Sequence, residues 1–254
     1  MRKVSKHRPP IDVSPDGQIP RSFRAAEGEY LDALPSQEER TGFARSEFDR
    51  LDKFKLRAVL CREQRFICVF CERQIEEGYP GPRIDHWKPL SIHHEFALHW
   101  KNLYLSCPTP KTCDDAKGNR SLGCEEGDSD LPWPTDFAYE NLLGFTSDGR
   151  IYVRTDVNVD DSVRQALALA LDPEPPGVGH RQSVLNLNDR VLLAARIAAI
   201  DGERERMRRE FAGRTATRPE REQRAATLLQ MNPFPAFVSV RVAWLRKFLG
   251  RGRG

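Results

Sequence analysis

Cysteines at two spacings mark the stretch of the chain whose side chains could do chemistry. The first pair is Cys-x-x-Cys at positions 68 and 71, and the second pair, at 107 and 113, is separated by five residues. Thiolates two residues apart reach one ion from a tight turn, and four thiolates form the tetrahedral shell that Zn²⁺ prefers. We therefore predict a structural zinc ion held by Cys68, Cys71, Cys107 and Cys113. The longer second loop leaves the fourth ligand open between Cys113 and Cys124 or a histidine.

Between and just after these cysteines lie residues suited to hydrolysis of a phosphodiester bond. An imidazole titrates near neutral pH and can act as a general base. Carboxylates are hard ligands that suit Mg²⁺ or Mn²⁺. The predicted catalytic residues are His86 as base, Asp85 and Asp114 as ligands of a divalent cation, Asn102 to orient His86, and Lys117 to contact phosphate. Asp115 could replace Asp114 as the second carboxylate ligand.

The order of these residues resembles the HNH (ββα-metal) endonuclease core. In that family a cysteine pair precedes Asp-His and a proline, followed by Asn-Leu, a cysteine, and a second cysteine leading to a lysine. The corresponding residues are Cys68 and Cys71, Asp85-His86 with Pro89, Asn102-Leu103, Cys107, and Cys113-Asp114 with Lys117. The chain departs from the family at Asp114, where the pattern has His or Asn. The resemblance implies a small zinc-stapled, treble-clef-like ββα-metal core that cuts nucleic acid.

A more extended likeness concerns the HNH subunit of Septu-type and retron-associated anti-phage systems. It lies in His86-Trp-Lys-Pro-Leu-Ser91, His99–Cys107, Asp114-x-x-Lys-Gly118, Val184–Asn188 and Pro233-Phe-Pro235. This resemblance implies a defence nuclease working with a separate ATPase of the ABC/SMC type. DNA is the substrate it implies first, while RNA, including tRNA, stays open. An alternative hypothesis is a catalytically degenerate zinc-binding module for nucleic acid or protein, which the replacement at Asp114 favours.

The helices and strands that must position these residues can be read from sequence patterns. These patterns predict an α+β fold, in which helices flank a small metal-centred core. Residues 1–35 are expected to form an extended N-terminal arm. The capping-box pattern Ser36-x-x-Glu39 and apolar periodicity predict one helix of roughly 25 residues ending near Gln64. Short extended pieces follow at 83–87 and 103–106, and a hairpin at 145–153. Helices are expected at 161–171, after Asn188, at 219–230 and at 234–249.

These elements suggest a nuclease domain with its N-terminal helix at 36–158 and a helical region at 159–254. The helical region carries no catalytic motif, so we assign it to partner binding or oligomerisation. Its arginine-rich face offers contact with nucleic acid as an alternative.

The composition limits the class of protein further. Hydrophobic residues make up 39% and charged residues 30% of the chain, which is typical of a globular protein. The net charge of +3 is weak evidence for a nucleic-acid partner, although both ends of the chain are basic. No apolar run approaches the roughly 20 residues that span a membrane, and no signal peptide is visible. We therefore expect a cytoplasmic location, where thiols stay reduced and favour metal binding over disulfides.

Overall fold

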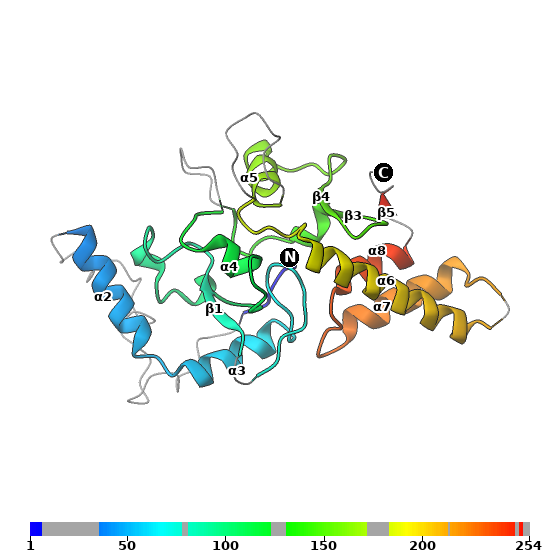
Figure 1. The fold of residues 1–254 in the computed structure, drawn as a ribbon, viewed down its shortest axis with the longest axis horizontal. Helices are drawn as coiled ribbons and strands as arrows, with labels where there is room; N and C mark the ends of the chain where they lie inside the picture. Colours follow the sequence, from blue (N-terminus) through cyan, green and yellow to red (C-terminus); the bar gives the residue numbers. More distant parts are fainter. Residues whose placement is uncertain are drawn as a thin grey trace.

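A computed structural model describes residues 1–6, 36–77, 81–122, 131–171, 183–212, 214–246 and the backbone of 249–250. This part of the chain has an α+β fold (Figure 1). The helices are α2 (Gln37–Asp49), α3 (Lys53–Glu63), α4 (Cys113–Lys117), α5 (Asp161–Leu171), α6 (Arg190–Glu210), α7 (Arg218–Gln230) and α8 (Val238–Leu245). The strands are β1 (Arg83–His86), β2 (Leu103–Ser106), β3 (Leu143–Thr146), β4 (Ile151–Val153) and β5 (Leu249–Gly250).

Two small sheets organise the centre of the molecule. Strands β1 and β2 are antiparallel, with Asp85 opposite Tyr104 and His86 opposite Leu103. In the second sheet β3 lies between β4, which is antiparallel to it, and β5, which is parallel to it. The hairpin expected near 145–153 is therefore present as β3 and β4. Because Asn102 directly precedes β2, the pairing of the first sheet brings it beside the end of β1, where Asp85 and His86 lie.

The N-terminal helical region is divided in two, although the sequence predicted one helix. The capping box is present, since Ser36 Oγ accepts from the Glu39 amide at 3.2 Å and Glu39 accepts from the Ser36 amide at 3.1 Å. The interruption comes from Asp52, whose Oδ1 accepts from the amides of Phe54 and Lys55 and so begins α3. The apolar periodicity continues across this break, which is why spacing alone suggested a continuous helix.

The hydrophobic core extends from the first residues of the chain to α8. Leu56 and Leu60 of α3, Leu105 of β2 and Val240 of α8 belong to one buried cluster. Three 3₁₀ turns, η2 (His94–Phe96), η3 (Trp100–Asn102) and η4 (Tyr139–Asn141), border it. Helix α2 lies at one end of the molecule and packs on η2 through a small separate cluster that includes Ala44.

The first six residues of the expected arm pack against this core, and residues 7–35 lie outside the described part. Met1 and Val4 are buried, and the Met1 ammonium donates to Phe70 O at 2.9 Å. It also lies 3.5 Å from the buried carboxylate of Glu72. Glu72 accepts in turn from the amide and hydroxyl of Ser239, the second residue of α8, at 2.8 and 2.6 Å. One buried carboxylate thus connects the start of the chain with its last described helix.

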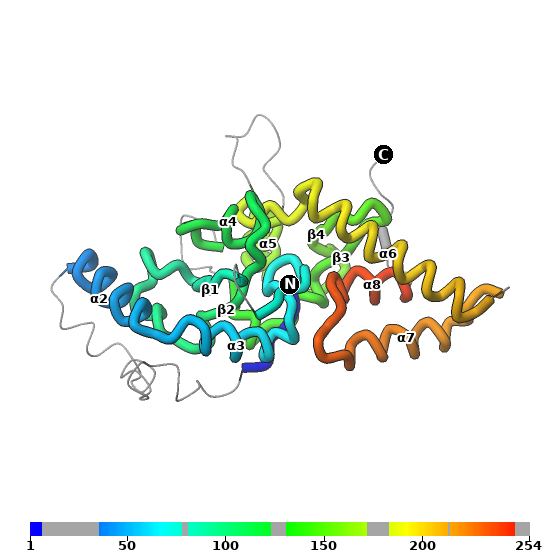
Figure 2. Tube along the Cα trace, turned by 60° about the horizontal axis from the view of Figure 1, so that its bottom comes forward, coloured from blue at the N-terminus to red at the C-terminus, as the bar shows by residue number. Residues whose placement is uncertain are grey.

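The C-terminal helices project from the opposite end to α2. Helices α6 and α7 run alongside each other, with α8 packed at their base (Figure 2). Asp189, rather than Asn188, caps α6 by accepting from the Val191 amide at 2.9 Å. Asn188 instead clamps β4, accepting from the Ile151 amide at 2.8 Å and donating to the Ile151 carbonyl at 3.0 Å. No helix in the described ranges is long and apolar enough to cross a membrane.

Candidate metal centre and catalytic site

The four predicted cysteines meet in one buried cluster. Their Sγ atoms all lie within 4.8 Å of one another. Three of the separations are 3.9 Å for Cys68–Cys113, 3.6 Å for Cys71–Cys107 and 3.7 Å for Cys107–Cys113. A tetrahedron with Zn–S bonds of about 2.3 Å has edges of about 3.8 Å. The cysteines are therefore positioned to hold a metal ion, consistent with structural zinc. Cys124 lies outside the described residues.

Three segments bring these thiols together. The first pair lies on a turn in which the Cys68 amide donates to Arg73 O, and the Val69 amide ties this turn to Leu105 of β2. Cys107 directly follows β2, and Cys113 opens α4. Burial raises the pKa of the Cys71 and Cys113 thiols well above their ordinary value, whereas hydrogen bonds with the neighbouring thiols lower the pKa of Cys107. A cation at the centre would compensate the charge of thiolates that the surroundings otherwise disfavour.

Asp85 is the most deeply buried carboxylate of the candidate catalytic site. Its Oδ1 accepts from Lys117 Nζ at 2.8 Å, while its buried Oδ2 has no hydrogen-bond partner in the described part of the chain. Burial raises the pKa of Asp85 to about 7, the Lys117 ammonium opposes this shift, and the nearby Asp114 carboxyl adds to it. Two neighbouring carboxyls and an unpartnered oxygen fit a hard divalent cation, which would relieve their repulsion.

The structure distinguishes between the two aspartates proposed as the second ligand. Asp115 is used elsewhere, because its Oδ1 accepts from Arg83 at 2.7 Å and its Oδ2 accepts from the Lys111 amide at 2.7 Å. Asp114 acts on Asp85, and its Oδ2 lies 3.7 Å from Arg83. The geometry favours Asp114 over Asp115 beside Asp85.

His86 is held with one ring nitrogen committed to the backbone. Its Nε2 lies 2.8 Å from Ala97 O, and its ring contacts Phe48 of α2 edge-on, with centroids 4.6 Å apart. A carbonyl oxygen only accepts, so Nε2 carries the proton and Nδ1 is the basic nitrogen. Burial lowers the pKa of His86 to about 4, against the effect of the Ala97 hydrogen bond. The imidazole is therefore neutral at pH 7 with Nδ1 unprotonated, and the same burial disfavours the imidazolium.

Asn102 fixes the loop that carries the partner of His86. It is fully buried, and its Oδ1 accepts from the Lys88 amide at 2.7 Å. Its Nδ2 donates to Lys88 O and to Phe96 O, each at 3.0 Å. Phe96 directly precedes Ala97, whose carbonyl accepts the hydrogen bond from His86 Nε2. Asn102 therefore acts on His86 through the backbone and makes no direct contact with the ring.

Lys117 has a different position from the one that a phosphate contact requires. Its side chain is 1% exposed, and its Nζ donates to Asp85 and, at 2.6 Å, to His86 O. The ammonium thus holds the end of β1 from inside the protein. The phosphate contact expected from the sequence has no exposed donor at this position.

Two cations near His86 were not singled out from the sequence. Arg45 and Lys53 both lower the pKa of His86 through their charge. Arg45 precedes Phe48 by three residues on α2, so the two side chains share a helix face, and Arg45 is exposed. Lys53 stacks on the Phe48 ring. The spacing between Arg45 and Phe48 was a usable signal, but nothing in the sequence placed Phe48 against His86.

The loop histidines do not join either centre. His93 lies 3.3 Å from Glu95, and His99 stacks on Trp133 with centroids 4.8 Å apart. Within the described ranges, the four cysteines are the one group of three or more histidine, cysteine, aspartate or glutamate side chains that is arranged to hold a metal ion. Fold and site thus define an α+β protein in which four buried cysteines are positioned to hold a metal ion, next to the buried pair of Asp85 and Lys117 and the half-buried His86. No family model matches the chain, and no curated protein matches it.

Proposed function

We propose that the protein is a metal-dependent endonuclease of the HNH type, which hydrolyses phosphodiester bonds, with DNA as the first expected substrate. One observation carries the proposal: the Asp85 carboxyl at the end of β1 interacts with the Asp114 carboxyl of α4, and Lys117 Nζ joins Asp85 to the His86 backbone, next to the cysteine cluster. In this proposal α4 supplies both a thiol to the cysteine cluster and the second carboxylate. The zinc ion then serves folding, while the carboxylates serve chemistry.

The residues take separate roles in the proposed reaction. His86 accepts a proton from the attacking water at Nδ1, since Nε2 is engaged by Ala97 O. Asp85 and Asp114 hold Mg²⁺ or Mn²⁺, which supplies charge stabilisation at the phosphate when bound. Lys117 orients Asp85, and Asn102 orients the backbone that aligns His86. Arg45 offers a guanidinium to the substrate phosphate from the side of α2.

The decisive experiment compares His86→Ala with His93→Ala, a loop histidine outside the cluster. Each zinc-loaded full-length variant is incubated with single-stranded DNA, duplex DNA and RNA in the presence of Mg²⁺ or Mn²⁺. Loss of a general base lowers the rate by about 10²–10⁴-fold, so His86→Ala should lose cleavage while His93→Ala keeps it. Zinc content and thermal unfolding confirm that both variants fold. Undiminished cleavage by His86→Ala would refute the assignment.

A second function is favoured by the position of Lys117. Its ammonium already compensates the charge of Asp85, as a bound cation would, which suits a zinc-stabilised module that binds nucleic acid or protein without cutting. Cleavage by the wild type, tested alone and with an ATPase of the ABC/SMC type, separates the two functions. That partner and a role in anti-phage defence are supported by the motif resemblance and are part of the proposal. Binding of all substrates without cleavage under both conditions would favour the module.

A further inference from the structure

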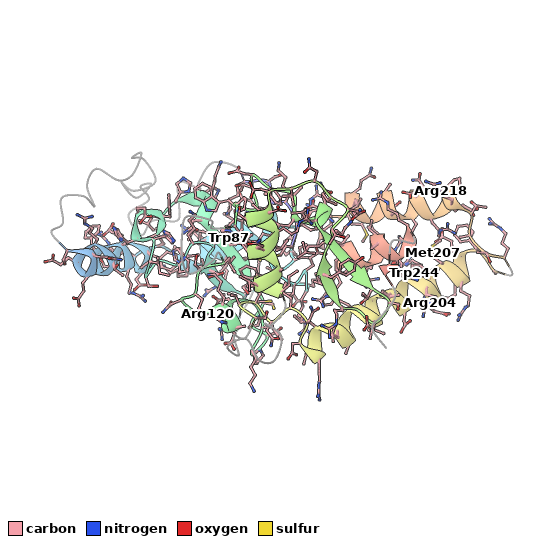
Figure 3. All side chains as sticks on the ribbon, turned by 90° about the horizontal axis from the view of Figure 1, so that it is seen from above. Trp87, Arg120, Arg204, Met207, Arg218 and Trp244 are labelled. Carbon is pink, nitrogen blue, oxygen red and sulfur yellow. The ribbon has the colours of Figure 1, made fainter. Side chains whose placement is uncertain are left out.

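An arginine-lined pocket lies where α6, α7 and α8 meet, away from His86. Its volume is about 400 Å³. We call it the arginine pocket, and its lining residues are Arg204, Met207, Arg208, Arg214, Thr215, Ala216, Arg221 and Trp244. Figure 3 shows Arg204, Met207 and Trp244 close together at this end of the molecule, with Arg218 of α7 at the same end. The pocket thus combines cations with an aromatic and an apolar side chain.

The surrounding helices concentrate positive charge. Residues 204–224 contain eight arginines, four glutamates and no lysine, a net charge of +4, whereas the whole chain carries +3. Arginine presents a planar fork that binds phosphate oxygens in a bidentate manner, and lysine acts as a point charge. The positive charge attracts anions in general, and the use of arginine rather than lysine favours phosphate groups among them.

The pocket arginines remain available to an anionic ligand. Arg214 is held by two hydrogen bonds to Glu220, so the available cations are the others. Arg204 pairs with Asp201 and Arg208 pairs with Glu205, and all four of these side chains are exposed. Such exposed pairs contribute about 0–1 kcal/mol, so a phosphate can displace them at little cost. Arg221 donates to Leu245 O at 3.1 Å and Ala216 O at 2.9 Å, and no carboxylate of the described residues pairs with it. Its positive charge is therefore uncompensated at the pocket wall.

Trp244 provides the flat surface of the pocket. The indole is half-buried, so it is anchored in the core and still presents part of its ring. The neighbouring Met207 is buried and supports it. Nucleobases stack on such aromatic side chains, and this stacking is available only when the base is not covered by a duplex. An acidic protein segment would use the arginines but leave the indole without a matching partner.

We propose that the arginine pocket binds single-stranded nucleic acid, with a base against Trp244 and the flanking phosphates on Arg204, Arg208 and Arg221. This site goes beyond the proposed nuclease function, because its helices carry none of the candidate catalytic residues. It holds a strand at the far end of the molecule from α2. Cleavage at His86 and binding at the pocket are separate properties of the protein.

The test uses the full-length, zinc-loaded protein in buffer without Mg²⁺ or Mn²⁺, so that binding is measured without cleavage. The probe is a fluorescein-labelled 12-nucleotide oligothymidylate, followed by fluorescence anisotropy at several salt concentrations. Stacking contributes about 1–3 kcal/mol per base, so Trp244→Ala should weaken binding roughly 5- to 150-fold. Trp244→Phe should retain most of the affinity. Arg208→Gln and Arg221→Gln should each lower the slope of log K against log salt by about 0.7.

Two controls keep the result interpretable. Arg154→Gln removes an arginine that also pairs with a carboxylate, Asp156, but lies outside the pocket, and it should leave the affinity unchanged. Quenching of intrinsic fluorescence by unlabelled oligothymidylate should be present in the wild type and lost in Trp244→Phe. This readout does not depend on the stability of the alanine variant.

Three results would overturn the proposal: equal affinity for a matched duplex, equal competition by polyglutamate, or unchanged binding by both Trp244 variants. Competition by polyglutamate would identify the pocket as a site for an acidic protein segment. A separate cleavage assay with Mg²⁺ distinguishes this failure from that of the nuclease. Trp244-dependent binding without cleavage, both alone and with the ATPase, refutes the nuclease alone, and cleavage with Trp244-independent binding refutes the pocket alone.

Discussion

Replacement of Asn102 by alanine should destabilise the protein and remove its activity together. The change deletes three hydrogen bonds, to the Lys88 amide, the Lys88 carbonyl and the Phe96 carbonyl. A net hydrogen bond contributes about 1 kcal/mol, and a buried polar group left without a partner costs about 1–3 kcal/mol. Since Asn102 is fully buried and the backbone relaxes in part, we expect a loss of about 2–4 kcal/mol in the free energy of unfolding.

The activity effect has a separate cause. Without the clamp, Ala97 O is no longer held in place to accept the hydrogen bond from His86 Nε2. The proportion of correctly oriented imidazole falls, so the turnover number should fall even in the fully folded variant. Cleavage is measured at a temperature where the folded fraction, known from urea unfolding, exceeds nine-tenths in both proteins.

Asn188→Ala is the matched control for Asn102→Ala. Asn188 also clamps the amide and the carbonyl of one residue, Ile151, but that residue lies in the second sheet, whereas His86 lies in the first. It should lose about 1–3 kcal/mol of stability and keep its turnover number. The reasoning is wrong if Asn102→Ala unfolds within about 0.5 kcal/mol of the wild type, or if the two variants lose activity equally.

Three further predictions follow from the same contacts. Metal analysis should find about one zinc per chain, and Cys113→Ser should lose it with several kcal/mol of stability, whereas Cys61→Ser, outside the cluster, should keep it. Arg45→Ala should lower kcat/KM by roughly 10- to 100-fold through a lost charge-assisted phosphate contact; Arg50→Ala, whose guanidinium pairs with Glu47, should not. Burial lowers the pKa of Lys6 to about 7. Between pH 7 and 10 the unfolded chain therefore binds more protons, and wild-type stability should rise relative to Lys6→Met by up to about 1.4 kcal/mol per pH unit; a pH-independent difference in unfolding free energy would contradict this.

Short-range patterns predicted the parts of the structure that local geometry decides. The spacing of Cys68 and Cys71 identified a turn with both thiols on one side. The Sγ atoms of the second pair lie within 4.8 Å of the first, as one tetrahedral metal site requires. The pattern from Ser36 to Glu39 identified the start of α2 because a capping box requires contacts across three residues only.

Other features depend on contacts that the sequence does not specify. The ammonium of Lys117 is buried because β1 pairs with β2 and α4 folds back on them, so its partner is Asp85 rather than phosphate. The break at Asp52 arises from competition between a side-chain cap and a helix whose apolar spacing continues. Arg45 lies near His86 because Phe48, on the same helix face, packs against the His86 ring, and these two rings are 38 positions apart in the sequence.

The carboxylate of Glu72 gives the molecule a thermodynamic property that neither end possesses by itself. It directly follows the zinc-ligand candidate Cys71, and it is shared between the Met1 ammonium and the first turn of α8. Separation of the Met1 ammonium weakens the charge compensation of the buried Glu72 carboxylate, and separation of α8 removes the two hydrogen bonds from Ser239. These parts should therefore unfold in one cooperative calorimetric transition. Trp244 belongs to α8, and binding equilibria linked in this way are reciprocal. Under conditions where part of the protein is unfolded, zinc in the cysteine cluster should raise the apparent affinity of the arginine pocket by raising the folded fraction, and ligand in the pocket should tighten zinc by the same factor.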